Sequence, residues 1–165
     1  MKRRGFLGAC AVVGGAVLLG SEQKPAAVLP KDIFSLIAGV QQHMFPEGST
    51  LPSAGEFNAT HFLQETVMHP LYDRDIRKFV IEGAEELQYR EKQQFLTYDM
   101  VHRERALRAY EKTAYGSEWL DRVMLLSLEG LLSDPIYGGN IHESGWISLQ
   151  TRGGEPRPVV RYAGK

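Results

Sequence analysis

The sequence predicts an all-α fold, with about five helices in a small bundle and a long irregular C-terminal segment rich in Gly and Pro. Apolar residues recur at helical spacing between Ile33 and Leu132, in stretches separated by Gly, Pro or helix-capping residues. No stretch of the 165 residues repeats the apolar–polar alternation of a half-buried strand. After Asp134 the frequency of Gly and Pro excludes another long helix.

The first helix is predicted over Asp32 to Phe45. Asp32 in its first turn suits the positive end of the helix dipole, and Pro46 and Gly48 end it. Its apolar face consists of Ile33, Leu36, Ile37, Val40 and Met44.

The second helix is predicted to begin near Gly55, because Ser53 and Glu56 have the spacing of a capping box. Its apolar face carries Phe62, Leu63 and Val67, and it ends before Pro70.

Three more helices follow, each with its own capping residue. Asp73 is predicted to cap the third, Thr97 the fourth (Tyr98 to Thr113), and Ser117 the fifth, which ends before Pro135. Their apolar faces are predicted to be Ile76, Phe79, Val80, Gly83 and Leu87; then Met100, Leu107 and Tyr110; then Leu120, Val123, Met124, Leu128, Leu131 and Leu132. Beyond Pro135, residues 145–150 have room for one helical turn and residues 158–162 for an extended segment.

The first 27 residues are predicted to be an export signal with a short linker, and residues 28–165 the helical domain. Three basic residues precede an uncharged apolar run that is shorter than a spanning helix needs. Arg3, Arg4, Phe6 and Leu7 resemble the twin-arginine signal of bacteria, which implies recognition by the twin-arginine translocase and a periplasmic location. Cleavage after Gly20 or near Ala26 and an uncleaved N-terminal anchor are the alternatives.

Composition excludes several function classes. Lys and Arg number 19 against 20 Asp and Glu, so no strongly basic surface indicates nucleic acid binding. A single Cys rules out an internal disulfide framework and any multi-thiolate metal site. The five His residues have no metal-binding spacing, and neither a dinucleotide-binding motif nor a nucleophile elbow occurs. We therefore assign no catalytic, cofactor-binding or metal-binding residue to this chain.

One segment combines residues that favour a close contact with another surface. It contains Pro135, Tyr137, Gly138, Gly139 and Asn140, followed by Trp146. Adjacent glycines permit left-handed backbone or close approach, Asn favours turns, and Tyr and Trp are typical of interface centres. Two interpretations stay open: a lid over the chain's own helices, and a contact surface for a partner.

The run Asp134–Asn140, the Gly145-Trp146 pair and the proline-rich Gly154–Pro158 tail resemble the small subunit, called subunit 3 or gamma, of gluconate 2-dehydrogenase. His43 to Pro46 is similar to the family's opening segment, and the twin-arginine leader fits as well. The additional Gly153 and Arg157 depart from the compact turn expected in the tail.

The resemblance implies a non-catalytic accessory subunit of a periplasmic, membrane-associated sugar or sugar-acid dehydrogenase. The partner would be a large subunit that contains FAD, stabilised and co-exported by this chain, and a multihaem cytochrome c subunit would accept the electrons. This chain itself would hold no cofactor. The alternative is a free-standing periplasmic helical binding protein or enzyme that shares the fold.

Overall fold

The computed structural model describes residues 28–161, and its elements confirm the all-α prediction. The α-helices are α1 (Lys31–Met44), α2 (Ala59–Val67), α3 (Arg74–Arg90), α4 (Met100–Glu111), α5 (Ala114–Leu132) and α6 (Ser144–Ser148), with short 3-10 helices η1 (Phe95–Thr97), η2 (Pro135–Tyr137) and η3 (Ile141–Glu143). No β-strand occurs within the described residues. The leader residues Arg3, Arg4, Phe6 and Leu7, and the domain boundary at residue 27, lie outside the described residues.

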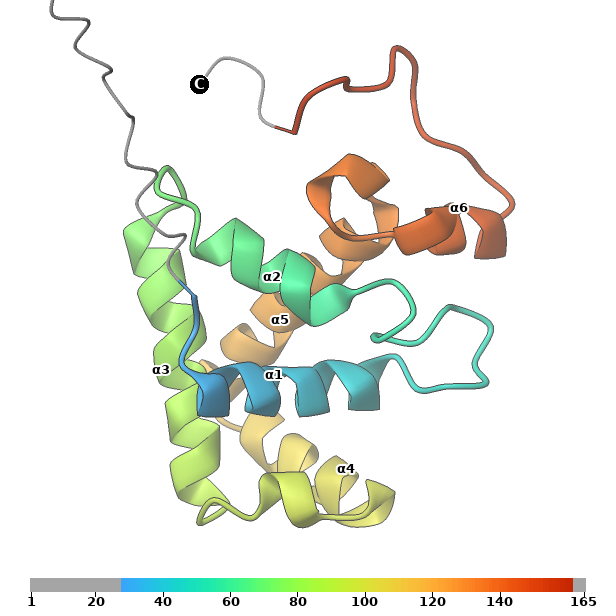
Figure 1. Cartoon of the computed structure of the whole chain (residues 1–165). Helices are drawn as coiled ribbons and strands as arrows, with labels where there is room; N and C mark the ends of the chain where they lie inside the picture. The colour runs from blue at the N-terminus through green and yellow to red at the C-terminus, as the bar shows by residue number, and fades with distance from the viewer. Residues whose placement is uncertain (1–27, 162–165) are drawn as a thin grey trace, which may run out of the picture.

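Helix α5 is the centre of the bundle. It packs against α1, α2, α3, α4 and α6, and α1 crosses in front of it in Figure 1. Helix α4 lies near the N-terminal end of α5, whereas α6 and the C-terminal segment gather at its other end. The buried side of α5 carries large apolar residues, among them Trp119, Leu120, Val123, Leu126 and Leu131. Burying these side chains supplies the main favourable term for folding.

Helices α3 and α5 are held close together where the Trp119 indole of α5 packs against Gly83 of α3. Trp119 is completely buried, and its indole Nε1 donates a hydrogen bond to the Val80 carbonyl at 2.9 Å. A Cβ on Gly83 would come within 2.0 Å of the Trp119 ring, so only glycine fits there. The Tyr110 hydroxyl, also buried, donates to the Gly83 carbonyl at 3.0 Å. Both polar groups are therefore satisfied within the apolar core.

The predicted start of the second helix, near Gly55, is wrong by four residues. The capping-box hydrogen bonds do form, since Ser53 N–H donates to Glu56 at 2.6 Å and Glu56 N–H to the Ser53 hydroxyl at 3.4 Å. They close a turn instead of a helix, because Asn58 adopts a left-handed conformation (φ 62°) and interrupts the chain. Helix α2 begins after Asn58, at Ala59.

Two other capping predictions are wrong by a few residues. Helix α4 is capped by Asp99, whose side chain accepts from His102 N–H at 2.9 Å, and the predicted cap Thr97 ends η1 instead. Helix α5 is capped by Thr113, whose hydroxyl accepts from Gly116 N–H at 3.0 Å, and Ser117 lies inside the helix. In each case a second good capping residue lay nearby, and packing decided which one is used.

The predicted apolar faces of α4 and α5 include residues that are not buried. Met100 is exposed, and so are Leu128 and Leu132. The helical turn predicted within residues 145–150 is confirmed as part of α6. Residues 159–161 form bends and a turn instead of the predicted extended segment. Between residues 28 and 161, no helix combines the length and the apolar character needed to cross a bilayer.

Candidate partner-contact site

The segment after α5 is a compact turn built on local hydrogen bonds. The Asp134 carboxylate accepts from Ile136 N–H at 3.0 Å and so caps η2. Gly138 ends η2 with a left-handed backbone (φ 92°), and its carbonyl accepts from the Asn58 side-chain amide at 2.8 Å. The turn is thereby tied to the loop that precedes α2. Glycine suits position 138 because other residues adopt this φ only with strain.

Gly139 and Asn140 hold the turn directly against α5. A Cβ on Gly139 would lie 2.4 Å from the Gly130 carbonyl oxygen, a distance that no side chain tolerates. Asn140 is completely buried, and its amide donates to the Ser133 carbonyl at 2.9 Å while its oxygen accepts from Gly145 N–H at 2.8 Å. One side chain therefore connects the end of α5 to the start of α6.

Trp146 also faces this chain's own helices. Its indole Nε1 donates to the Leu132 carbonyl at 2.9 Å, one of the carbonyls left unpaired at the end of a helix. Gly153 lies against one part of the ring, where a Cβ would be 2.3 Å away. The guanidinium of Arg157 lies 4.8 Å from the ring centroid, in a cation–π contact. Trp146 is thus enclosed by the end of α5 and by the tail.

The tail is held by two arginines. Arg157 forms an ion pair with Asp134 and a second one, at 3.0 Å, with Glu143. Hydrogen bonding to Arg157 holds the pKa of the Asp134 carboxyl below its usual value, and the two carboxylates raise the pKa of the guanidinium. Arg161 pairs with Glu65 on α2 and donates to the Tyr137 carbonyl at 2.6 Å. The tail therefore links α2, η2 and η3.

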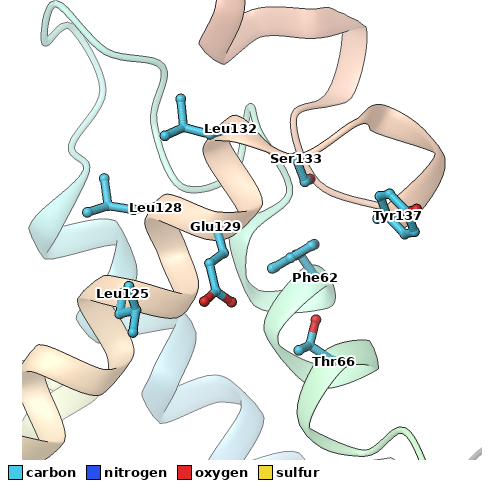
Figure 2. Close-up of a pocket in the computed structure, with 8 residues that line it drawn as sticks. All are labelled: Phe62, Thr66, Leu125, Leu128, Glu129, Leu132, Ser133 and Tyr137. Carbon is cyan, nitrogen blue, oxygen red and sulfur yellow. The ribbon is translucent and has the colours of Figure 1, made fainter. Parts of the chain in front are cut away.

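Pro135 and Tyr137 lie at the half-exposed edge of the same turn. Tyr137 lines a groove of about 500 Å³ together with Phe62 and Thr66 of α2. In Figure 2 the opposite wall belongs to α5, which contributes Leu125, Leu128, Glu129 and Leu132, and to Ser133 directly after it. The predicted site residues are therefore divided. Gly139, Asn140 and Trp146 are buried against this chain's own helices, whereas Tyr137 borders an open groove.

The leucines of this groove were not predicted as site residues. Leu125 is 45% exposed, Leu128 37% and Leu132 48%. One feature of the sequence could have indicated them. The predicted fifth helix has more leucines than one face can hold, whereas an ordinary surface helix has a single apolar stripe. Sequence reasoning placed Leu128 and Leu132 in the core and left Leu125 unassigned.

A separate polar network joins α1 to α4 at the segment His43 to Pro46. The imidazole Nε2 of His43 lies 2.6 Å from a carboxylate oxygen of Glu104, and Arg108 donates to the other oxygen at 2.8 Å. These hydrogen bonds lower the pKa of Glu104. No three His, Cys, Asp or Glu side chains within residues 28–161 are grouped as a metal ion would need.

Comparison with known proteins gave one result. Neither the curated proteins nor the solved structures contained a significant match. A family model named gluconate 2-dehydrogenase subunit 3 matches residues 31–154, which extend from α1 through the Trp146 region into the tail. The match covers the six α-helices that lie within residues 28–161 and the whole Asp134–Asn140 turn. Because it spans well over half of the sequence, this chain belongs to the gluconate 2-dehydrogenase subunit 3 family.

Proposed function

We propose that this chain is the small accessory subunit of a periplasmic FAD-dependent dehydrogenase that oxidises a sugar or a sugar acid. The observation that carries the proposal is the family match over residues 31–154, because the family is named for a subunit of a dehydrogenase. Family membership gives the coarse role, a subunit of a dehydrogenase complex. The substrate class, the flavin, the location and the export route are the proposed details.

In this proposal the large subunit binds both FAD and the substrate, and this chain binds the folded large subunit. A protein that binds only the folded form of its partner stabilises that form by mass action. The half-exposed edge at Tyr137 and the neighbouring groove support such a role, since they offer apolar surface on a chain of otherwise ordinary composition. A multihaem cytochrome c is the proposed electron acceptor of the complex.

The leader gives the proposal its second part. Arg3 and Arg4, followed by Phe6 and Leu7, are the proposed address for the twin-arginine translocase, a route that accepts folded cargo. A large subunit that is bound before export crosses with this chain and needs no signal of its own. Membrane association then follows from the complex or from retention of the leader.

The first experiment is purification of the tagged full-length chain from its native cells under gentle extraction. Mass spectrometry identifies the co-purifying chains, and an absorbance spectrum detects flavin. The expected result is one large flavoprotein at equal stoichiometry that oxidises sugars or sugar acids. Recovery of a colourless chain without a partner would contradict the proposal and favour a free-standing binding protein. Turnover of substrate by the isolated chain would favour an enzyme.

A further inference from the structure

We propose that the groove between α2 and α5 binds an amphipathic helix of the large subunit, one that carries a Lys or Arg beside its apolar stripe. This inference rests on the proposed accessory role and adds the surface and the chemistry of the contact. It is carried by three features of the groove: the spacing of its leucines, the wall opposite them, and a carboxylate that has no cation.

The exposed leucines have the spacing of a helix-packing seam. Leu125, Leu128 and Leu132 follow one another at intervals of three and four residues, so they lie along one side of α5. The other side of α5 is already buried by the bundle. A helix that is apolar on both sides is normally covered on both sides. Apolar residues at alternating intervals of three and four are the pattern against which a second helix packs by knobs-into-holes contacts.

The groove has a wall that would hold such a helix in place. Phe62 and Thr66 of α2 stand four residues apart, line the same groove as the leucines, and lie across from Glu129 of α5 in Figure 2. Tyr137 closes the groove at the η2 end. Grooves that bind amphipathic helices take anchor side chains spaced by three, four and seven residues. Leu125, Leu128 and Leu132 are the apolar side chains of α5 against which such anchors would pack.

Glu129 indicates that the helix bound in the groove carries a positive charge. Figure 2 shows its carboxylate directed into the groove between Leu125 and Thr66. Within the described residues this carboxylate forms no ion pair and no hydrogen bond. Its negative charge helps to raise the pKa of Tyr72, although burial of Tyr72 is the larger cause. Arg122, two turns earlier on α5, also acts on Tyr72 but does not pair with Glu129.

Covering this carboxylate with a purely apolar surface would be costly, because a buried charge needs a partner of opposite sign. Glu129 follows Leu128 directly and so occupies the flanking position of the seam, where coiled coils place their interhelical ion pairs. An occupant with a Lys or Arg at the matching position keeps Glu129 satisfied, and a helix without one is disfavoured.

The same geometry argues against a second copy of this chain. Two α5 helices that pair antiparallel about Leu128 would bring their Glu129 carboxylates within one helical turn of each other. The same pairing would place Arg122 opposite Asp134, which already pairs with Arg157, and away from either Glu129 carboxylate. Like charges in close contact destabilise such a dimer. The occupant that this geometry favours is therefore a helix of the large subunit.

The test uses the intact complex purified with the tagged full-length chain. Replacing Leu128 by Asp, or Glu129 by Lys, is expected to weaken retention of the large subunit at least about tenfold, and Glu129→Gln to weaken it less. The matched control is Val101→Asp, since Val101 is 65% exposed on α4, away from the groove. The three replaced side chains are all exposed, and the melting temperature of each of the four isolated variants checks that folding is unchanged.

A photo-reactive phenylalanine analogue in place of Leu128 then identifies the occupant. A cross-link to a helix of the large subunit supports the proposal. A cross-link between two copies of this chain, a cross-link to residues 1–27, or no cross-link in an intact complex would each overturn it.

Failure of the groove and failure of the accessory role are distinguishable. If the wild-type chain retains no large subunit, the accessory role itself is wrong. If the wild type and Leu128→Asp retain the large subunit equally, the accessory role stands and only the assignment of the groove is wrong. Restored retention of Glu129→Lys by a Lys→Glu or Arg→Glu change in the cross-linked helix would locate the proposed ion pair.

Discussion

Asn140 shows how one residue stabilises an irregular segment. It combines complete burial, a left-handed backbone (φ 47°) and two hydrogen bonds that join α5 to α6. Asn is one of the few residues other than Gly that adopts this backbone region readily. Its conformation and its hydrogen bonds therefore both depend on the same side chain.

Replacing Asn140 by Ala is expected to lower the free energy of unfolding by about 2–4 kcal/mol, because two buried backbone groups lose their partners. Urea denaturation of the isolated chain measures the loss. Asn140→Gly keeps the backbone conformation without the hydrogen bonds and separates the two contributions. A change below about 0.5 kcal/mol for Asn140→Ala, the size of an ordinary surface substitution, would contradict the role assigned to the side chain.

Gly139 and Gly154 form a matched pair for a second prediction. A Cβ on Gly139 would meet the Gly130 carbonyl at 2.4 Å, whereas a Cβ on Gly154 has nothing within 4 Å. Gly139→Ala is expected to destabilise the chain by about 1–3 kcal/mol, as overpacking does. Gly154→Ala is expected to be neutral or slightly stabilising. Thermal melting of both variants checks the contrast, and equal melting temperatures would show that the turn at Gly139 does not pack closely on α5.

At the scale of elements, the tail depends on charge. Asp134 pairs with Arg157, and this pairing lowers the pKa of the Asp134 carboxyl in the folded chain. The pair therefore adds stability above the pKa of an unfolded Asp, about 3.9, and the gain disappears as the pH falls through the lower folded value. Because the pair is only partly buried, added salt is expected to reduce its contribution.

Asp134→Asn tests this pH dependence, because Asn keeps an oxygen for the Ile136 N–H and loses only the charge. Urea midpoints of the wild type and the variant, measured from about pH 6 to about pH 2, are expected to differ most at neutral pH and to converge in acid. Other carboxyl groups with lowered pKa values, such as Glu104, affect the stability of both proteins equally, so their contribution cancels in the difference. A constant difference at all pH values would show that charge pairing is not the cause.

The 3-10 helix η2 contributes Tyr137 to the groove edge, and this residue separates the lid from the partner interpretation. Tyr137→Ala is expected to weaken the complex with the large subunit more than it destabilises the free chain, since large aromatic side chains dominate contact energies. Co-purification and thermal melting measure the two effects. Tyr89→Ala is the control, because Tyr89 is 84% exposed on α3. A melting loss in the free chain as large as the loss of binding would favour the lid.

At the scale of the whole molecule, the leader and the helical domain have separate proposed tasks. Arg3→Lys combined with Arg4→Lys is expected to leave both this chain and its large subunit in the cytoplasm, because Lys lacks the forked donors of Arg. Cell fractionation with dehydrogenase assays locates both chains, and because Lys keeps the positive charge, the double variant tests the guanidinium groups alone. Export of the large subunit in the double variant would contradict co-export.

The elements of the bundle were predictable because local physics determines them. Helical spacing of apolar residues located α1, α3 and α5 to within a few residues, and Asp73 caps α3 as expected, accepting from Ile76 N–H at 3.0 Å. The starts of α2, α4 and α5 were wrong because several capping residues compete in each connection, and a left-handed Asn58 was not visible in the pattern.

The candidate site was predictable only in part. The motif Tyr137–Asn140 could be recognised as a turn, because Gly and Asn are the residues that favour turn conformations. That Asn140 and Trp146 point inward could not be read from the sequence, because both interpretations require the same residues. The prediction that Leu128 and Leu132 belong to the buried face of the fifth helix was also wrong. Helical spacing shows that residues share a face, but it does not show what covers that face.

The sequence by itself determined the helical class, most of the buried faces and the family resemblance, because periodicity, capping and short motifs are local properties. The tertiary structure alone decided which side of α5 the bundle covers and which side it leaves to the groove. It also decided that Arg157 and Arg161 fasten the tail across α2 and the η2–η3 turn. These outcomes depend on contacts between segments far apart along the chain, and only the packed fold brings those segments together.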